Sequence, residues 1–179
     1  MKKLILSVAC VLAAVSAYAQ GTVNFANVAA GLSAPVFDID GTTKIGSSAF
    51  LAQLYVGDSA ASLTAVPGTT PFLGTAPTGT GFFTGGTKTL TQAPGSRPFF
   101  QVKAWAASGG ATYEAALAAG VKTGQSTVFQ IGADLGGGGV PAATPATLVG
   151  LTGFSLVPEP SVIALGILGA AALLIRRRK

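Results

Sequence analysis

The amino-acid sequence predicts an all-β fold, in the form of an antiparallel β-sandwich of jelly-roll type with one short helix. Several short segments alternate apolar and polar side chains with a period near two. Clusters of glycine and proline separate these segments, and only one stretch has the composition of a helix. The chain has 179 residues, with 25 glycines and 10 prolines, which suits one folded domain rather than a disordered chain.

Two segments give the clearest strand pattern. In residues 50–56 the even-numbered side chains are apolar and share one face, while Gln53 lies on the other. Residues 99–105 repeat this arrangement, with apolar side chains opposite Gln101 and Lys103. Further strands are predicted at residues 126–131, 22–26, 36–39, 87–91 and 148–156. Turns are predicted at Asp40-Gly41, Pro67-Gly68, Gly85-Gly86, Pro94-Gly95 and Gly109-Gly110.

Residues 112–119 break the strand pattern. They are rich in alanine, place Glu114 in the first turn and end at Gly120, which suits the C-terminal cap of a helix. We therefore expect a short helix here, between two strands. The glycine run 136–139 predicts a flexible loop before the last strand.

The formal net charge of +5 comes from the two ends of the chain. Between Gln20 and Val157, five basic residues balance five acidic ones, so the body is neutral. A basic surface for nucleic acid is therefore not expected. The single cysteine, Cys10, lies in the N-terminal apolar run, and the chain has no histidine. We expect no disulfide in the body, no metal site and no cofactor.

The N-terminus has the pattern of a secretory signal peptide over residues 1–19. Lys2 and Lys3 precede an apolar run, and Ala17 and Ala19 supply the small side chains that a signal peptidase requires. Cleavage after Ala19 would leave Gln20 as the new N-terminus. A retained membrane helix is the alternative, but the apolar run is shorter than the roughly 20 residues that span a bilayer.

The C-terminus predicts a membrane tail after a body that ends at residue 156. A Pro-Glu-Pro triplet at 158–160 precedes an apolar segment, in which we expect a transmembrane helix over residues 161–175. That helix would be about 22 Å long, so it needs snorkelling side chains or a thinned bilayer to cross. Positive charges favour the cytoplasmic side, which places the body outside the cell membrane. These charges belong to Arg176, Arg177, Arg178 and Lys179.

The tail resembles the PEP-CTERM sorting signal of bacterial exported proteins, a signal also labelled an ice-binding protein C-terminal domain. The resemblance covers residues 157–179 and implies that Pro158, Glu159 and Pro160 are the motif recognised by an exosortase. Such a membrane enzyme would cut near the motif and release the body to the cell surface or the extracellular matrix. Residues 21–27, 52–57 and 101–105 also look like segments of exported proteins with this tail.

Few residues in the body have the spacing of a chemical site. Asp38, Asp40 and Gly41 form a D-x-D-G sequence, but Lys44 stands where a calcium loop needs an acidic ligand, so a solvated turn is favoured. The serines lack a histidine partner, and no nucleophile elbow is present. A hydrolase with two carboxylates would need acids from distant segments to meet. We therefore do not expect an enzyme.

Two groups of side chains suggest binding rather than catalysis. Threonines cluster at residues 78–80 and 87–91, as on an ice-binding sheet, although threonine is also a common strand residue. Trp105, Tyr55 and Tyr113 are candidates for stacking on sugars, although a single tryptophan more often packs in the core or at its rim.

These observations predict an exported, non-catalytic surface or matrix protein. Its expected partners are signal peptidase, an exosortase, the membrane, and exopolysaccharide or other copies of itself, because a body with few charges repels such partners weakly. A glycan-binding surface module is the alternative, followed by an ice-binding protein or a secreted hydrolase.

Overall fold

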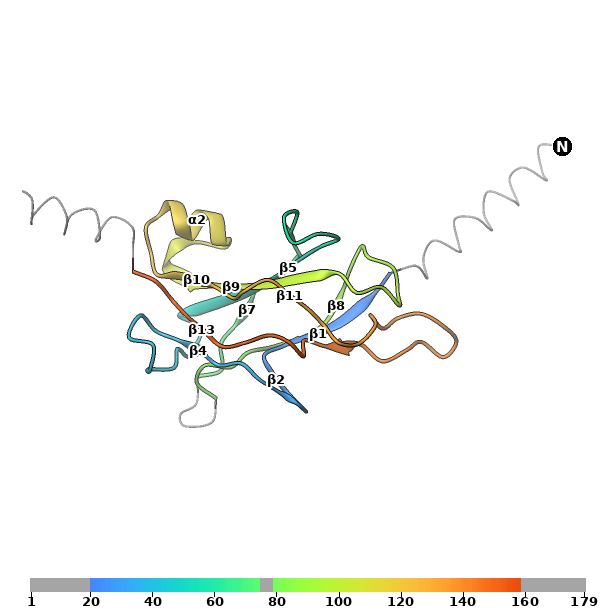
Figure 1. Cartoon of the computed structure of the whole chain (residues 1–179). Coiled ribbons are helices and arrows are strands. Elements are labelled where there is room, and N and C mark those ends of the chain that lie inside the picture. Colours follow the sequence, from blue (N-terminus) through green and yellow to red (C-terminus); the bar gives the residue numbers. More distant parts are fainter. Residues whose placement is uncertain (1–19, 75–78, 159–179) are drawn as a thin grey trace, which may run out of the picture.

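The computed structural model describes residues 20–74 and 79–158 (Figure 1). In this part of the chain, short strands form several sheets and one α-helix is present, so the predicted all-β class is confirmed. The predicted signal helix and transmembrane helix lie outside the described residues. The elements are β1 (Thr22–Ala26), β2 (Val28–Ala29), β3 (Leu32–Ser33), β4 (Val36–Phe37), β5 (Phe50–Gly57), β6 (Thr64–Ala65), β7 (Thr70–Pro71), β8 (Thr84–Thr89), β9 (Phe99–Ala106), the 3-10 helix η1 (Ala107–Gly109), α2 (Tyr113–Ala118), β10 (Thr123–Gln125), β11 (Phe129–Gln130), β12 (Ala146–Thr147) and β13 (Phe154–Ser155).

The antiparallel pair β5 and β9 forms the centre of the largest sheet. Its register runs from Phe50 opposite Ala106 to Gly57 opposite Phe99. β6 and β7 pair with β5, and β10 and β11 pair with β9. The two strongest strand predictions are therefore confirmed to within one residue, because alternating β-branched and aromatic side chains favour a pleated backbone.

A second sheet has the strand order β12-β1-β8. β8 contains Gly85 and Gly86, so the predicted turn at this pair is wrong. The register between β1 and β8 shifts there by one residue, as in a β-bulge. A Cβ on Gly85 would lie 2.4 Å from the Thr70 hydroxyl oxygen, and Gly86 has a φ of 67°. The two glycines therefore allow a bulge next to β7 rather than a chain reversal.

Three predicted strands are shorter than expected, and the first of them, residues 36–39, forms a strand only at Val36–Phe37. In the segment 126–131 only Phe129 and Gln130 pair as a strand, because the Ser126 hydroxyl itself accepts the Val102 N–H at 3.0 Å. The segment 148–156 is interrupted by a turn, in which the Leu151 N–H donates to the Leu148 carbonyl. β12 and β13 therefore flank this turn as two separate short strands.

Two strand pairs are parallel, which corrects the purely antiparallel prediction. β12 runs parallel to β1, and β13 runs parallel to β4. The other pairs between named strands are antiparallel. Both parallel partners come from the last part of the described chain, which returns after a long connection to strands near its beginning. Alternation of side chains does not determine the direction of such a distant partner.

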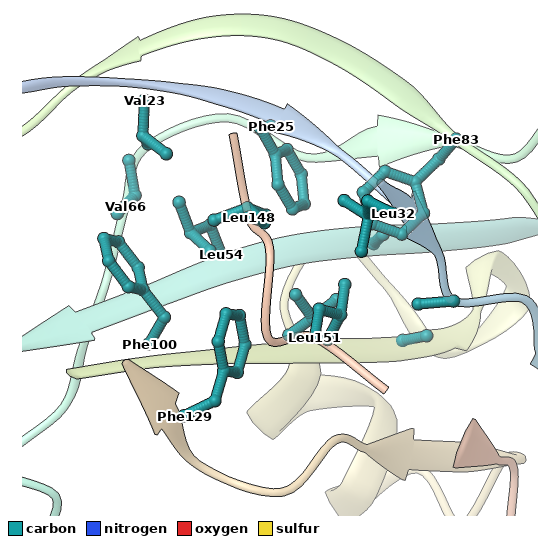
Figure 2. Close-up of a cluster of buried hydrophobic side chains, with 14 of the residues drawn as sticks. Val23, Phe25, Leu32, Leu54, Val66, Phe83, Phe100, Phe129, Leu148 and Leu151 are labelled. Carbon is teal, nitrogen blue, oxygen red and sulfur yellow. The ribbon is translucent and has the colours of Figure 1, made fainter. Parts of the chain in front are cut away.

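The hydrophobic core lies between β1 and the β5–β9 pair (Figure 2). Val23 and Phe25 of β1 point towards Leu54 of β5, and Leu148 lies among them. The Phe25 and Phe83 rings pack with their centroids 4.7 Å apart. All five side chains are excluded from solvent, so each contributes about 1.5–3 kcal/mol of burial free energy.

A buried amide ties the end of β1 to two distant segments. The Asn27 Nδ2 donates to the carbonyl oxygens of Ala34 and Gly81 at 2.8 Å each. Its Oδ1 accepts the Phe83 N–H at 2.8 Å. Every polar atom of this fully buried amide has a partner, so its burial does not carry an unpaired polar group.

The predicted short helix is present as α2. The Thr112 hydroxyl oxygen caps it by accepting the Ala115 N–H, and Glu114 lies in its first turn. The chain leaves the helix after Ala119 through Gly120, whose φ of 70° favours glycine. Together with η1, α2 lies against the face of β9 that points away from the core (Figure 1).

Candidate functional site

The chain joins the folded body at Gly21. The Gly21 N–H donates to the Gln92 carbonyl at 2.7 Å, and a Cβ on Gly21 would lie 2.5 Å from the nearest side-chain atom. Gly21 is buried, whereas Gln20 is exposed. Of the predicted signal-peptidase site, Gln20 is described, and Ala17 and Ala19 lie outside the described residues. Cleavage after Ala19 would therefore leave one exposed residue, Gln20, before the residue at which the body begins.

The chain leaves the body at Val157. The Val157 N–H donates to the Thr123 carbonyl at 2.7 Å, and the half-buried Pro158 follows. The other predicted tail residues, Glu159, Pro160 and the basic cluster 176–179, lie outside the described residues. Within the described part of the chain, no helix is both long and apolar enough to cross a membrane.

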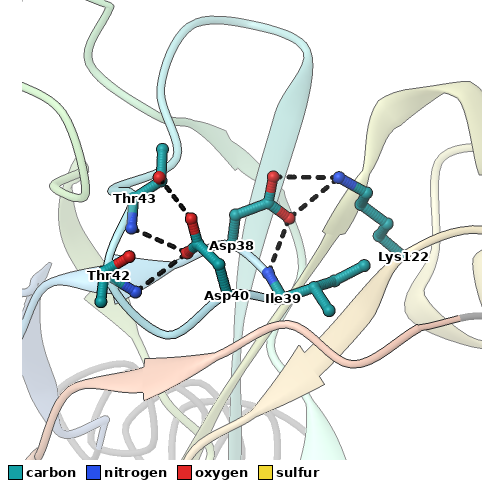
Figure 3. A network of polar contacts seen from close by, with 6 residues as sticks. All are labelled: Asp38, Ile39, Asp40, Thr42, Thr43 and Lys122. Atoms are coloured by element: carbon teal, nitrogen blue, oxygen red, sulfur yellow. Dashed lines mark hydrogen bonds and ion pairs between the residues drawn. The ribbon is translucent and has the colours of Figure 1, made fainter.

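The D-x-D-G sequence forms a turn in which both carboxylates have protein partners (Figure 3). Both Asp38 oxygens accept hydrogen bonds from the Lys122 Nζ at 2.9 Å. Asp40 accepts the N–H groups of Thr42 and Thr43 at 2.9 and 2.8 Å, and also the Thr43 hydroxyl. The geometry is that of an Asx turn at Asp40, and Asp38 is bound by a lysine rather than by solvent alone, as the solvated turn predicted from the sequence would have it.

Both aspartates in this turn are easier to ionise than usual. The hydrogen bond from Lys122 lowers the pKa of Asp38. The Thr43 hydroxyl and the two backbone N–H groups lower the pKa of Asp40 to about 2. A carboxylate stabilised in this way is a poor general acid or base near neutral pH.

Two of the three aromatic candidates for sugar stacking, Trp105 and Tyr113, pack against each other, and Tyr55 meets α2 through a hydrogen bond to Glu114. Trp105 is 0% exposed and donates its Nε1–H to the Gly110 carbonyl at 3.0 Å. The Tyr113 ring meets the Trp105 ring edge-on at 6.2 Å. Tyr55 is 4% exposed. A sugar cannot stack on a tryptophan with no exposed surface, so the proposed stacking role of Trp105 is wrong and its packing role holds.

Lys103 is the fourth member of this cluster. The sequence pattern placed Lys103 on the polar face of its strand but did not predict its contact with the aromatic rings. Its Nζ lies 4.0 Å from the centre of the Tyr55 ring and 4.6 Å from that of Tyr113. Glu114 lies 3.9 Å away and accepts the Tyr55 hydroxyl at 2.8 Å. Burial, with the neighbouring Glu114, raises the pKa of Tyr55 above its ordinary range. The space between the Tyr55 and Tyr113 rings is therefore occupied by a cation of the protein itself, the Lys103 ammonium group.

The threonines of β8 belong to a larger polar face. Because Val23 points into the core, Thr22 and Asn24 point to the opposite side of the sheet. Thr89 pairs with Thr22, while Thr87 and Thr147 pair with Asn24, so these side chains share that side. Thr78 lies outside the described residues. The sequence identified the threonines of β8 as one strand of this uncharged face. It could not identify β1 and β12 as the other two strands, because this depends on the order of the strands in the sheet.

The acids in the described residues do not gather into one site. Asp134 forms an ion pair with Arg97 at 2.6 Å, whereas Asp38 pairs with Lys122 and Glu114 with Lys103. Within residues 20–74 and 79–158, no three potential metal-binding side chains lie together. Asp38, Glu114 and Asp134 each contact a different side chain of the protein, which fits a structural role.

Comparison of the chain with models of known protein families, with curated proteins and with solved structures gave no match.

Proposed function

We propose that this protein is an exported, non-catalytic component of the cell surface or extracellular matrix, processed at both ends. The observation that carries the proposal is the order of the C-terminal segments: a Pro-Glu-Pro triplet, an apolar segment and a basic terminus. The triplet starts at Pro158, one residue after the last backbone hydrogen bond between this strand end and the body in the described part of the chain. A cut after the triplet would remove none of the residues that form the described hydrogen bonds of the body.

The proposed route has three steps. A signal peptidase removes residues 1–19 during export, and the apolar segment 161–175 then holds the body at the membrane. The basic cluster 176–179 stays on the cytoplasmic side. An exosortase that recognises Pro158, Glu159 and Pro160 releases the body from this anchor.

The proposed body is a two-layer sandwich of jelly-roll type. One layer is the sheet around β5 and β9, and the other is the sheet around β1, with the apolar cluster of Figure 2 between them. This arrangement leaves the polar face of β1, β8 and β12 pointing outward. The parallel partners β12 and β13 are departures from a regular jelly roll.

A structural rather than catalytic role is supported by what the acids do. The carboxylates of Asp38, Asp40, Glu114 and Asp134 all accept hydrogen bonds from groups of the protein itself. The balanced charges of the body weaken repulsion between copies and from polysaccharide. We therefore propose that the released body associates with exopolysaccharide or with itself.

The experiment compares wild type with Glu159→Ala by intact mass and membrane fractionation of protein from the producing cells. Val162→Leu is the matched control, because it changes a tail residue but preserves the triplet and the apolar segment. Wild type and the control should lose the tail and leave the membrane, whereas Glu159→Ala should keep both the tail and the membrane location. If all three proteins keep the tail, exosortase processing is refuted and the segment is a permanent anchor.

A further inference from the structure

The residue at the predicted N-terminal junction has an unusual position. Gln20 is exposed, while the next residue, Gly21, is buried and bonded to Gln92. Cleavage after Ala19 would therefore leave one exposed residue in front of a fixed backbone. That residue carries a side-chain amide that can reach its own α-amine through a five-membered ring.

We propose that the exported body carries a pyroglutamate at its N-terminus, formed from Gln20. This inference rests on the cleavage after Ala19 in the proposed function. The α-amino nitrogen attacks the side-chain carbonyl carbon Cδ, and the bond from Cδ to Nε2 breaks. The Nε2 group leaves as ammonia after taking a proton from the attacking amine. The reaction consumes no oxidant, reductant or water.

The body accommodates this ring without rearrangement. Ring closure involves only the α-amine and the exposed side chain, so the Gln20 carbonyl group and the Gly21 N–H remain in place. The Gln20 carbonyl oxygen faces the loop at Gly137, where an added Cβ would come within 2.7 Å of it. The hydrogen bond from Gly21 to Gln92 is therefore preserved, and the position at which β1 begins does not change.

Cyclisation has two consequences for the exported body. A free α-amine, with an ordinary pKa of about 8, would add a positive charge to a body whose side chains balance, and the lactam removes that charge. The lactam also removes the amine that aminopeptidases require. Because β1 is the middle strand between β12 and β8, trimming from the N-terminus would remove residues that hold two other strands.

The test uses protein from freshly harvested producing cells, quenched in acid, with intact mass and peptide mapping of the N-terminus. Wild type is compared with Gln20→Ser, whose side chain has no carbonyl group and cannot form a lactam. The wild-type N-terminal peptide should be one ammonia lighter than a peptide with free Gln20 and should resist aminopeptidase until a pyroglutamyl peptidase is added. The Gln20→Ser peptide should have its full mass and should be digested directly.

The outcomes separate this inference from the proposed function. A wild-type chain that begins at Gln20 with a free amine overturns the pyroglutamate and leaves export with cleavage intact. Loss of ammonia that develops only during storage also overturns it as a property of the exported protein. A chain that still carries residues before Gln20 refutes cleavage at Ala19, and the pyroglutamate with it.

Discussion

The two faces of the β5–β9 pair are both covered, but by different kinds of side chain. The inner face presents Leu54, Phe100 and Val102, which are 0% exposed and meet the apolar side chains of β1. The outer face presents Trp105 and Lys103, which meet aromatic and charged groups from α2. The same alternating strands therefore build an apolar core on one side and an amphipathic cluster on the other.

The difference follows from what covers each face. The inner face is closed by a sheet, so a charged group there would lose its water without gaining a partner. The outer face is closed by α2, a helix of only six residues, which leaves solvent at its margins. Lys103 can bury its stem there while Glu114, with a 64% exposed side chain, stays in water. We expect truncations on the inner face to cost more stability than polar changes on the outer face.

The largest effect is expected from Phe25→Ala on the core side. This change removes a fully buried ring that packs against Phe83, and it should lower the free energy of unfolding by about 3–5 kcal/mol. Urea unfolding of the body, residues 20–158, measures this loss. Phe82→Ala is the control, because Phe82 is only half-buried and should cost clearly less. Equal losses would contradict the placement of the core.

A smaller effect is expected from Lys103→Met on the outer face. Methionine keeps an unbranched stem but removes the cation between the Tyr55 and Tyr113 rings, so we expect a loss of about 1 kcal/mol. Lys44→Met is the matched control, because Lys44 is exposed and lies over a single ring. If both variants lose the same stability in urea unfolding, the sandwiched cation has no special contribution.

Tyr55→Phe should cost slightly less again. It removes only the hydroxyl that donates to Glu114, so a loss of about 0.5–1 kcal/mol is expected. The raised pKa of Tyr55 keeps this donor protonated, so the loss should be the same at pH 6 and at pH 9. Unfolding curves at both values check this, with Tyr113→Phe as the control for removing a hydroxyl from the opposite ring. A loss that disappears at pH 9 would contradict a protonated donor.

The smallest effect at neutral pH is expected from Asp40→Asn, in the turn outside both faces. The pKa of Asp40 is lowered from 3.8 to about 2, so its contribution is complete above the unfolded value and is lost as the pH falls through the folded value. The difference in thermal midpoint between wild type and Asp40→Asn should therefore shrink from pH 5 to pH 2. A difference that stays constant over this window would show that the Asp40 charge does not contribute to stability.

Part of the fold was predictable because it depends on neighbouring residues. The strands β1, β5 and β9 and the helix α2 were predicted with nearly correct bounds. A turn at Asp40 was predicted from its Asp-Gly sequence, whereas the Thr112 cap was not. The sequence named all three aromatic candidates, but it could not show that Tyr113 and Glu114 of α2 meet Trp105 and Tyr55, because this depends on the packing of α2 against β9.

The sequence by itself determined the class of fold, the positions of the main strands and the segments that predict export at both ends. These features depend on alternation, caps and short motifs, which act over a few residues. Only the tertiary structure decided the parallel partners of β1 and β4, the bulge at Gly85 and the burial of Trp105. These features depend on contacts between segments far apart in the chain. The physical reason is that burial and strand direction are set by which side chains and strands pack together in space, and the local sequence does not specify these partners.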